Sequence, residues 1–275
     1  MDNAVTMHPM SQSSFPPLSS ENIAALRDVH ARRIAIKVVA ETGSTNADLL
    51  AAAAQLREPT LLVAENQTAG RGRAGRSWQS EPGATLTFSL AWKFELPPQA
   101  LLGLPLAVGT VIAETLARFD VDAKLKWPND VLLGRDKMAG VLIETAPAGQ
   151  GPAIWAVIGI GINILMPQSL AERIDRPVAA ASNLRQRREE VLAALLDNLS
   201  VALDLFALHG FAVFAERWNQ LHAWRGLPVV VVDRGEVLQR GSAWGVDAQG
   251  QLLLDTVKGR VAVVAGDVSL RGAEV

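Results

Sequence analysis

A nine-residue stretch, GRGRAGRSW at 70–78, holds a dense group of residues that could bind an anion. Its glycines permit unusual backbone angles, and its arginines carry permanent charges on planar donors that suit carboxylates and phosphates. Trp78 at its end offers a flat surface on which a base can stack. This combination predicts a mobile loop that closes over a phosphorylated nucleotide. The alternative is a solvated surface loop, which is the usual fate of a charge cluster.

The spacing of Gly70, Gly72 and Gly75 also matches a dinucleotide-binding fingerprint. Such a fingerprint must open a helix, because the helix N-terminus holds the pyrophosphate. Here the glycines lead toward TLTFSLAW at 85–92, in which apolar and polar residues alternate as in a strand. The sequence therefore argues against a nicotinamide or flavin dinucleotide site.

A second motif, KWPND at 126–130, lies at the end of a predicted strand. Pro128 ends the strand and turns the chain, so Asn129 and Asp130 project polar groups at a place where mixed sheets often bind ligands. Taken alone, the motif is equally compatible with an ordinary turn.

Two further motifs place small residues inside apolar strands. KMAGVLIE at 137–144 has Lys137 before the strand and Gly140 within it, and GIGIN at 159–163 ends in Asn163. Glycine in a strand often marks close approach by a ligand or another backbone. A buried asparagine must be hydrogen-bonded, and either a ligand or a tight turn can supply the partner.

Composition excludes several kinds of chemistry. The 275 residues carry a formal net charge of −2 and no cysteine, which excludes disulfides and thiolate nucleophiles and gives no general attraction to nucleic acid or anionic membrane. The apolar run at 154–166 is too short to span a bilayer and no signal peptide is evident, so we expect a cytoplasmic protein. The histidines lie outside every motif and receive no catalytic role: His8, His30, His209 and His222.

Periodicity predicts alternating strands and helices up to residue 226 and short strands with turns after it. Expected strands cover 34–40, 60–65, 85–92, 123–127, 138–144 and 153–160. Expected helices cover 21–33, a segment opened by a Thr45–Asp48 capping box, 98–119, 187–208 and 211–223. We therefore expect an α+β fold with a flexible leader (1–20) and short helix in 1–33, a mixed sheet flanked by helices in 34–226, and a small β-barrel in 227–275.

Taken in order, GSTN (43–46), ENQTAGRGRAGRSW (65–78), KWPND, KMAGVLIE, GIGIN and GDVSLR (266–271) resemble biotin–protein ligases over about 34–272. The resemblance implies a biotin/lipoate ligase-like catalytic domain followed by an SH3-like barrel. It implies an enzyme that forms biotinyl-5′-AMP from biotin and ATP, with Mg²⁺ accompanying ATP. It then transfers biotin to one lysine of a biotin carboxyl carrier domain of a biotin-dependent carboxylase.

The resemblance also implies roles for individual residues. Those expected to bind biotin are Ser44, Thr45, Asn46, Gln67, Gly70, Arg71, Arg73, Lys137, Gly140, Gly159 and Gly161. Those expected to bind ATP are Arg73, Arg76, Trp78, Lys126, Asn129 and Asn163. Those expected to serve the reaction are Lys137, Arg73 and Asp130. No resident metal site is expected.

The sequence departs from many relatives in ways that bear on partners. Only the leader and one possible helix precede the first strand, so we expect a monofunctional ligase that binds no DNA and no membrane, as a monomer or weak homodimer. Ala74 removes a charge that some relatives carry in the loop. The segment 165–183 corresponds to an adenylate-covering loop in relatives, but it offers no recognisable motif.

Other functions remain open at this point. A lipoate ligase or octanoyltransferase shares the expected architecture, although it would need a different loop and a pocket for a linear acyl chain. A nucleic-acid-binding regulator would use the basic loop, but the net charge of −2 argues against it. A catalytically inactive biotin sensor would lack some phosphate-facing motif, and every such motif is present.

Overall fold

A computed structural model describes residues 16–149, 151–174, 176–233, 235–266 and 268–273. Within them, a seven-stranded mixed sheet has the order β1-β2-β3-β7-β6-β5-β4. Only β1 and β2 are parallel; the remaining neighbours pair in antiparallel fashion. The strands are β1 (Ala35–Thr42), β2 (Thr60–Gln67), β3 (Thr85–Phe94), β4 (Ala123–Lys126), β5 (Asp130–Leu133), β6 (Asp136–Pro147) and β7 (Ile154–Asn163).

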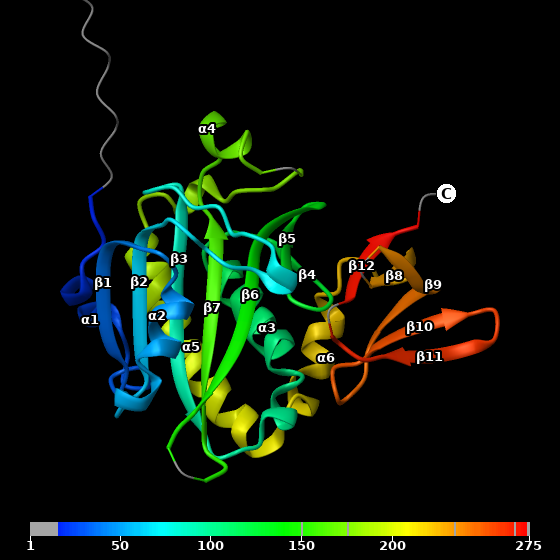
Figure 1. Cartoon of the computed structure of the whole chain (residues 1–275). Coiled ribbons are helices and arrows are strands. Elements are labelled where there is room, and N and C mark those ends of the chain that lie inside the picture. Colours follow the sequence, from blue (N-terminus) through cyan, green and yellow to red (C-terminus); the bar gives the residue numbers. More distant parts are fainter. Residues whose placement is uncertain (1–15, 150, 175, 234, 267, 274–275) are drawn as a thin grey trace, which may run out of the picture.

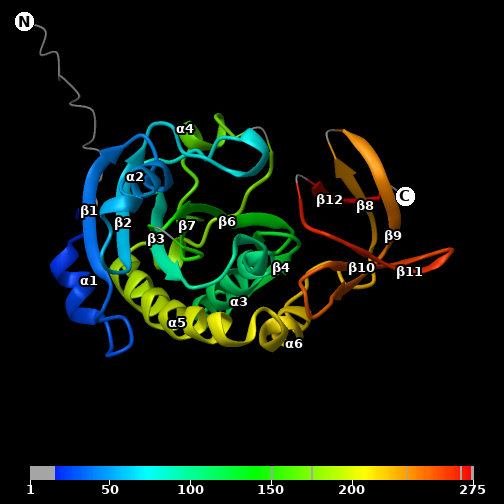
Figure 2. The same ribbon diagram turned by 60° about the horizontal axis from the view of Figure 1, so that its bottom comes forward.

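Helices cover the two faces of this sheet unequally (Figures 1 and 2). The long helices α3 (Leu104–Ala117) and α5 (Arg188–His209) lie on one face, and the short α2 (Thr45–Ala51) lies on the other. The remaining helices are α1 (Ser20–Leu26), α4 (Gln168–Ala171) and α6 (Ala212–Gln220), with 3-10 turns at Ala53–Gln55, Arg73–Gly75, Pro98–Leu101 and Ser182–Leu184.

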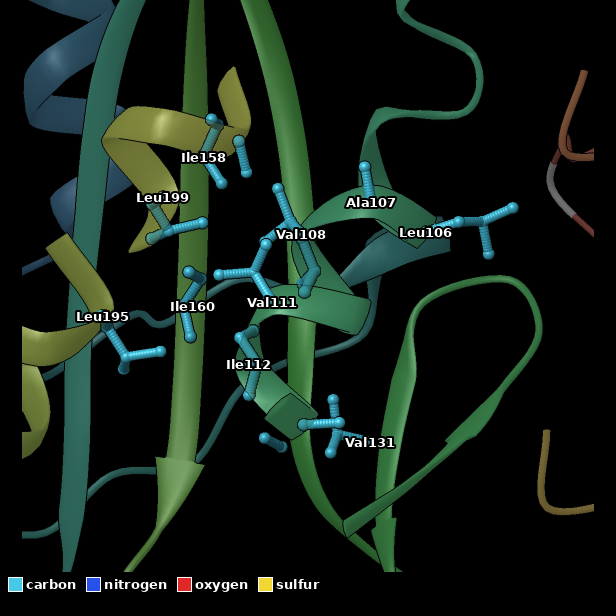
Figure 3. Close-up of a cluster of buried hydrophobic side chains, with 14 of the residues drawn as sticks. Leu106, Ala107, Val108, Val111, Ile112, Val131, Ile158, Ile160, Leu195 and Leu199 are labelled. Carbon is cyan, nitrogen blue, oxygen red and sulfur yellow. The ribbon is translucent and has the colours of Figure 1, made fainter. Parts of the chain in front are cut away.

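The alternation of side chains along each strand determines which residues lie on each face of the sheet. Ile158 and Ile160 of β7 point toward the long helices, where they meet Val111 of α3 and Leu199 of α5 (Figure 3). Successive side chains of a strand point to opposite faces, so the intervening glycines of β7 face the other side. The helical segment Pro98–Ala117 and α5 are long and apolar enough for a membrane span, but their apolar stretches are 72% and 56% buried within the protein.

The C-terminal region forms the SH3-like unit that the sequence predicts. A five-stranded antiparallel sheet has the order β11-β10-β9-β8-β12 among the described residues. Its strands are β8 (Pro228–Asp233), β9 (Glu236–Val246), β10 (Leu252–Thr256), β11 (Gly259–Val263) and β12 (Val268–Gly272). The expected fold class is therefore confirmed, while the exact domain boundaries stay predictions.

Specific hydrogen bonds attach this unit, which we call the barrel, to the catalytic domain. The buried Trp127 indole donates to the Gly250 carbonyl at 3.1 Å. Asn219 of α6 bonds both backbone groups of Val246, at 3.0 and 2.8 Å. The connecting segment also pairs with β4, because Leu125 exchanges backbone hydrogen bonds with residues 221 and 223. The barrel is thus docked beside β4 and α6 rather than tethered by a free linker (Figure 1).

The N-terminal segment differs from the sequence-based expectation. The helix expected over 21–33 is only Ser20–Leu26, because tertiary bonds take over the following backbone: Asp28 N–H donates to the Asp197 carboxylate at 3.0 Å. Leu18 is buried and its N–H donates to Glu65 at 2.6 Å, so residues 16–20 pack against the sheet. The rest of the expected flexible leader, 1–15, lies outside the described residues.

Two other elements also differ. The helix expected over 98–119 begins as a 3-10 turn, and α3 itself starts only at Leu104. The short strand β5 was not expected, because its four residues directly follow the turn at Pro128 and are too few to display a period.

His222 lies in the connecting segment, buried against the Trp218 ring at 4.7 Å between centroids. Neither ring nitrogen has a hydrogen-bond partner among the described residues. Burial, with a smaller contribution from Arg225, lowers the pKa of this imidazole to about 4. The folded protein therefore holds His222 neutral where an unfolded chain would protonate it.

We predict that His222 makes stability fall as the pH is lowered from about 6.5 to about 4. Above this window both states are neutral; within it, only the unfolded chain takes up the proton, at a cost of about 3 kcal/mol by pH 4. Denaturant unfolding of His222→Phe should lose this part of the pH dependence. His209→Phe, at an exposed histidine, should retain it. An unchanged pH dependence in His222→Phe would contradict the assignment.

Candidate active site

The loop at 70–78 is a compact excursion between β2 and β3 that doubles back on itself. Trp78 N–H donates to the Gly70 carbonyl at 2.8 Å, and Gly72 N–H donates to the Arg76 carbonyl at 2.7 Å. A side chain at Gly70 would place its Cβ only 2.4 Å from the Trp78 carbonyl oxygen, so this position requires glycine. At the tip, Ala74 and Gly75 both have positive φ, 52° and 70°.

On one side of this loop, polar side chains at the start of α2 lie against the sheet. Ser44 caps α2, and Thr45 donates two hydrogen bonds to Gln67 Oε1, one from its N–H at 2.8 Å and one from its hydroxyl at 3.1 Å. The Thr45 hydroxyl also contacts Ser89 Oγ at 2.6 Å, and Ser89 donates to Asn46 Oδ1 at 2.5 Å. These groups form a buried polar network between α2 and the sheet.

This network is one donor short. Two hydroxyl protons must serve three oxygen–oxygen contacts, those of Thr45 with Gln67, Thr45 with Ser89, and Ser89 with Asn46. The amides cannot rotate to help, because Gln67 already accepts from the Thr45 N–H and Asn46 Nδ2 already donates outward. A ligand that offers N–H groups therefore suits the network.

Glu144 of β6 joins the network to the loop. Its Oε2 accepts from Asn46 Nδ2 at 2.9 Å and from Arg71 Nη2 at 2.9 Å. Sequence reasoning gave no role to Glu144 or to Ser89. The sequence offers one signal for Ser89, its place on the polar side of the alternating stretch 85–92. In the structure this side chain is fully buried.

On the other side of the loop, basic side chains gather around Asp130. Lys137 Nζ lies 2.5 Å from Asp130 Oδ1 in a mostly buried ion pair. Lys126 lies over the Trp224 ring, at 4.4 Å from its centroid. Burial lowers the pKa of Lys126, Asp130 opposes this shift, and neighbouring cations, Lys137 first, lower the pKa further.

Arg73 connects the loop to both domains. Its Nη1 donates to Asn129 Oδ1 at 3.1 Å, and its Nη2 donates to the carbonyl of Gly266 in the barrel. Asn129 is itself held by its Nδ2, which donates to the Val141 carbonyl at 2.7 Å. The loop arginines thus face different neighbours, Arg71 toward the polar network and Arg73 toward the barrel.

Cavities open around the loop. One of about 390 Å³ is lined by Arg76, Trp78, Lys137 and Asn163 and by four residues of a later loop: Arg173, Ile174, Arg176 and Val178. A second of about 590 Å³ continues past Arg76 and is lined by these further residues: Arg73, Lys126, Asn129, Asp130, Arg176, Ser269 and Arg271. A third of about 610 Å³ lies between the loop, the start of α3 and Leu142–Thr145.

The segment 165–183, which sequence reasoning left without site residues, closes the first cavity. Asn163 Nδ2 donates to the Ala179 carbonyl at 3.1 Å, so part of its amide holds this segment. Arg173 pairs with Glu81 at 3.0 Å, and Arg176 lines both neighbouring cavities. Sequence reasoning also missed Arg271 of β12, because its proximity to Lys126 depends on how the barrel docks.

The expected site residues all lie on or beside the face of the sheet opposite α3 and α5. Gly140, Gly159 and Gly161 form part of this face, beneath Lys137, Asn46 and Trp78 respectively. The structure therefore brings the expected biotin and ATP groups into one region, arranged on either side of the loop. The individual ligand assignments stay predictions.

A hydrogen-bonding network on one side of a basic loop and cations on the other are compatible with a protein that binds a small acid and a nucleotide together. Residues 36–163 match the biotin/lipoate A/B protein ligase family, and residues 226–271 match the biotin protein ligase C-terminal domain. The chain belongs to this family.

Individual relatives agree. The chain is 36% identical to the bifunctional ligase/repressor BirA of Salmonella typhimurium, over 87% of this chain and 75% of that protein. It is 34% identical to the biotin–[acetyl-CoA-carboxylase] ligase of Mycobacterium tuberculosis, over 85% and 88% of the two chains. A biotin protein ligase from Aquifex aeolicus in complex with biotin and ATP has a similar structure, with a TM-score of 0.73, 30% identity, and coverage of 87% and 99%.

The cation cluster yields a prediction of its own. In Asp130→Asn the pKa of Lys126 should fall further, because the variant removes the carboxylate that raises it and leaves Lys137 unpaired. An NMR titration of the lysine side chains would measure this, with Lys126→Arg identifying the resonance. Asp122→Asn, at a surface pair with Lys124, should leave Lys126 unchanged. A raised or constant pKa in Asp130→Asn would contradict the account.

Proposed function

We propose that this protein is an ATP-dependent ligase that forms biotinyl-5′-AMP from biotin and ATP and transfers biotin to a lysine of a biotin carboxyl carrier protein. The observation that carries the proposal is the placement of the donor-deficient polar network and the cation cluster on opposite sides of one loop. A ligand with an N–H-bearing head and a carboxylate tail spans from one to the other.

The polar network suits the ureido head of biotin. The ureido ring carries two N–H donors and one carbonyl acceptor. Its N–H groups supply the donor that the Thr45, Ser89 and Asn46 oxygens lack. The Arg71–Glu144 ion pair borders the network on the loop side. Ser44 and Gln67 contribute from the ends of α2 and β2.

The cation cluster suits the reaction of the carboxylate with ATP. A biotin carboxylate oxygen attacks the α-phosphorus, a new phosphorus–oxygen bond forms, and the bond to the leaving pyrophosphate breaks. Both reactants are anions, so Lys137 and Arg73 act by screening their repulsion and stabilising the in-line transition state. The lysine amine of the carrier then attacks the acyl carbon and releases AMP, with no protein nucleophile required.

The two connected cavities suit the nucleotide. The 390 Å³ cavity between Trp78, Asn163 and Ile174 would take the adenosine. The neighbouring 590 Å³ cavity holds Arg76, Lys126, Asn129 and the barrel's Arg271 beside the expected polyphosphate. The barrel therefore completes the phosphate site in this proposal, which gives its docking a function.

Mg²⁺ fits this site as a companion of ATP. Asn129 and Asp130 supply side-chain oxygens to the 590 Å³ cavity, and each is already bonded to a cationic side chain. Among the described residues no cluster of three or more acidic, histidine or cysteine side chains could hold a metal ion. Mg²⁺ usually binds through one or two carboxylates plus substrate phosphates. It would supply charge neutralisation of the phosphates, and the ligand positions stay predictions.

Other features of the proposal concern partners and location. A cytoplasmic protein, monomeric or weakly dimeric, that binds neither DNA nor membrane remains the expectation. The alternative in the same family is a lipoate or octanoate ligase or transferase. A linear acyl chain offers no N–H groups to the polar network, which favours biotin.

A direct test incubates the protein with ATP, Mg²⁺ and an isolated biotin carrier domain, and supplies either biotin or lipoate. Intact-mass spectrometry should detect a biotinylated carrier and no lipoylated carrier. A carrier domain whose acceptor lysine is replaced by arginine should remain unmodified. Lipoylation in preference to biotinylation would overturn the proposal in favour of its alternative.

Lys137→Met should separate binding from chemistry, because it retains the length of the side chain but removes its charge. We expect adenylate formation to slow by about 100- to 1000-fold, the usual cost of one transition-state donor. Biotin affinity, measured by calorimetry, should change far less. Lys124→Met, at a surface lysine, is the matched control. Adenylation at the wild-type rate, followed by pyrophosphate release, would remove Lys137 from the mechanism.

A further inference from the structure

The glycines on the open face of β6 and β7 each lie against one functional side chain. Gly140 and Gly161 are paired across the two strands, and Gly159 lies two residues before Gly161 on the same face. A Cβ at Gly159 would come within 2.3 Å of Asn46 Oδ1. A Cβ at Gly161 would come within 2.3 Å of Trp78 Cε2 and 2.4 Å of Cζ2.

Backbone conformation does not explain these glycines. Neither Gly159 nor Gly161 is among the glycines with positive φ, so an L-residue could adopt their backbone angles. Glycine also weakens a strand, because it lacks a side chain to pack. The opposite face of the same strand carries the bulky Ile158 and Ile160. Space above the strand is therefore the physical requirement at both positions.

We propose that Gly159 and Gly161 are separate positioning residues, one for each substrate. Gly159 leaves the space in which the Asn46 amide lies, and Asn46 belongs to the network facing biotin. Gly161 leaves the space in which the Trp78 ring lies, and this ring lines the 390 Å³ cavity proposed for ATP. This rests on the proposed function, and it replaces the expectation that both glycines serve close approach of the backbone to biotin.

The glycine positions differ in how far the side chain above each one can move to make room for a methyl group. The Trp78 ring is rigid and fused, so an added methyl group at 161 must lift the whole ring. Asn46 is held on both sides, by Ser89 and by Glu144, so it cannot shift without breaking a hydrogen bond. A Cβ at Gly140 would come within 2.7 Å of Lys137 Nζ, the far end of a flexible side chain that is ion-paired with Asp130. This flexibility makes position 140 more tolerant of a methyl group than position 161.

The test compares two substitutions in β7 and measures the effect of each on both substrates. Gly161→Ala should raise the KM for ATP by about 5- to 150-fold, the range for losing a base–aromatic stack, and leave the biotin Kd within about twofold. Gly159→Ala should weaken biotin binding, measured by calorimetry without ATP, and leave the KM for ATP at saturating biotin nearly unchanged. Effects of equal size on both substrates in both variants would overturn the proposal.

A double-mutant cycle links Gly161 to its occupant. Once Trp78→Ala has removed the ring, adding Gly161→Ala should cause no further rise in the KM for ATP. Additive effects would show that the methyl group acts elsewhere. The near-UV circular dichroism of Gly161→Ala should resemble that of Trp78→Ala, whereas Gly159→Ala should resemble the wild type. This spectrum tests whether Gly161 positions the Trp78 ring, even if the protein activates an acid other than biotin.

Discussion

Mutual repulsion among cations is the constraint on which this site depends. Lys126, Lys137, Arg76 and Arg176 converge on one region. Burial lowers the pKa of Lys126 most, and repulsion from the other three cations lowers it further. Among the described residues, Asp130 is the carboxylate that opposes this shift. Like charges held close together destabilise one another, and a bound polyphosphate would relieve that repulsion. The same excess of positive charge allows a carboxylate to approach a phosphate in the reaction that we propose.

The sheet makes this arrangement possible by giving its two faces different tasks. One face packs isoleucines of β7 against α3 and α5 and supplies the apolar core (Figure 3). The other face has small residues at its centre, so α2 and the loop at 70–78 can lie close to the backbone. The barrel then closes the region from the side of β4, with Trp127 and Asn219 fixing its position. Each substrate site is therefore assembled from segments far apart in the chain.

The sequence predicts the parts whose signal is local. The alternation at 85–92, the apolar helices and the change to short strands after 226 indicate the two units correctly, and the motifs identify the residues that gather on one face. What escapes prediction depends on tertiary contacts. The helix at 21–33 ends early because Asp197 captures the backbone at Asp28. Arg176 and Arg271 line the 590 Å³ cavity through a loop and a docked domain. Arg176 carries no local pattern, and the motif that contains Arg271 does not indicate which residues the barrel will face.

The central claim is that the loop separates a biotin head site from an ATP site, so that the protein alone activates the acid. Exchange of labelled pyrophosphate into ATP, measured without any carrier domain, tests this claim most directly. The account predicts exchange that requires biotin and that stays at background when lipoate replaces it. Exchange driven by lipoate, or no exchange although biotin and ATP both bind, would contradict it.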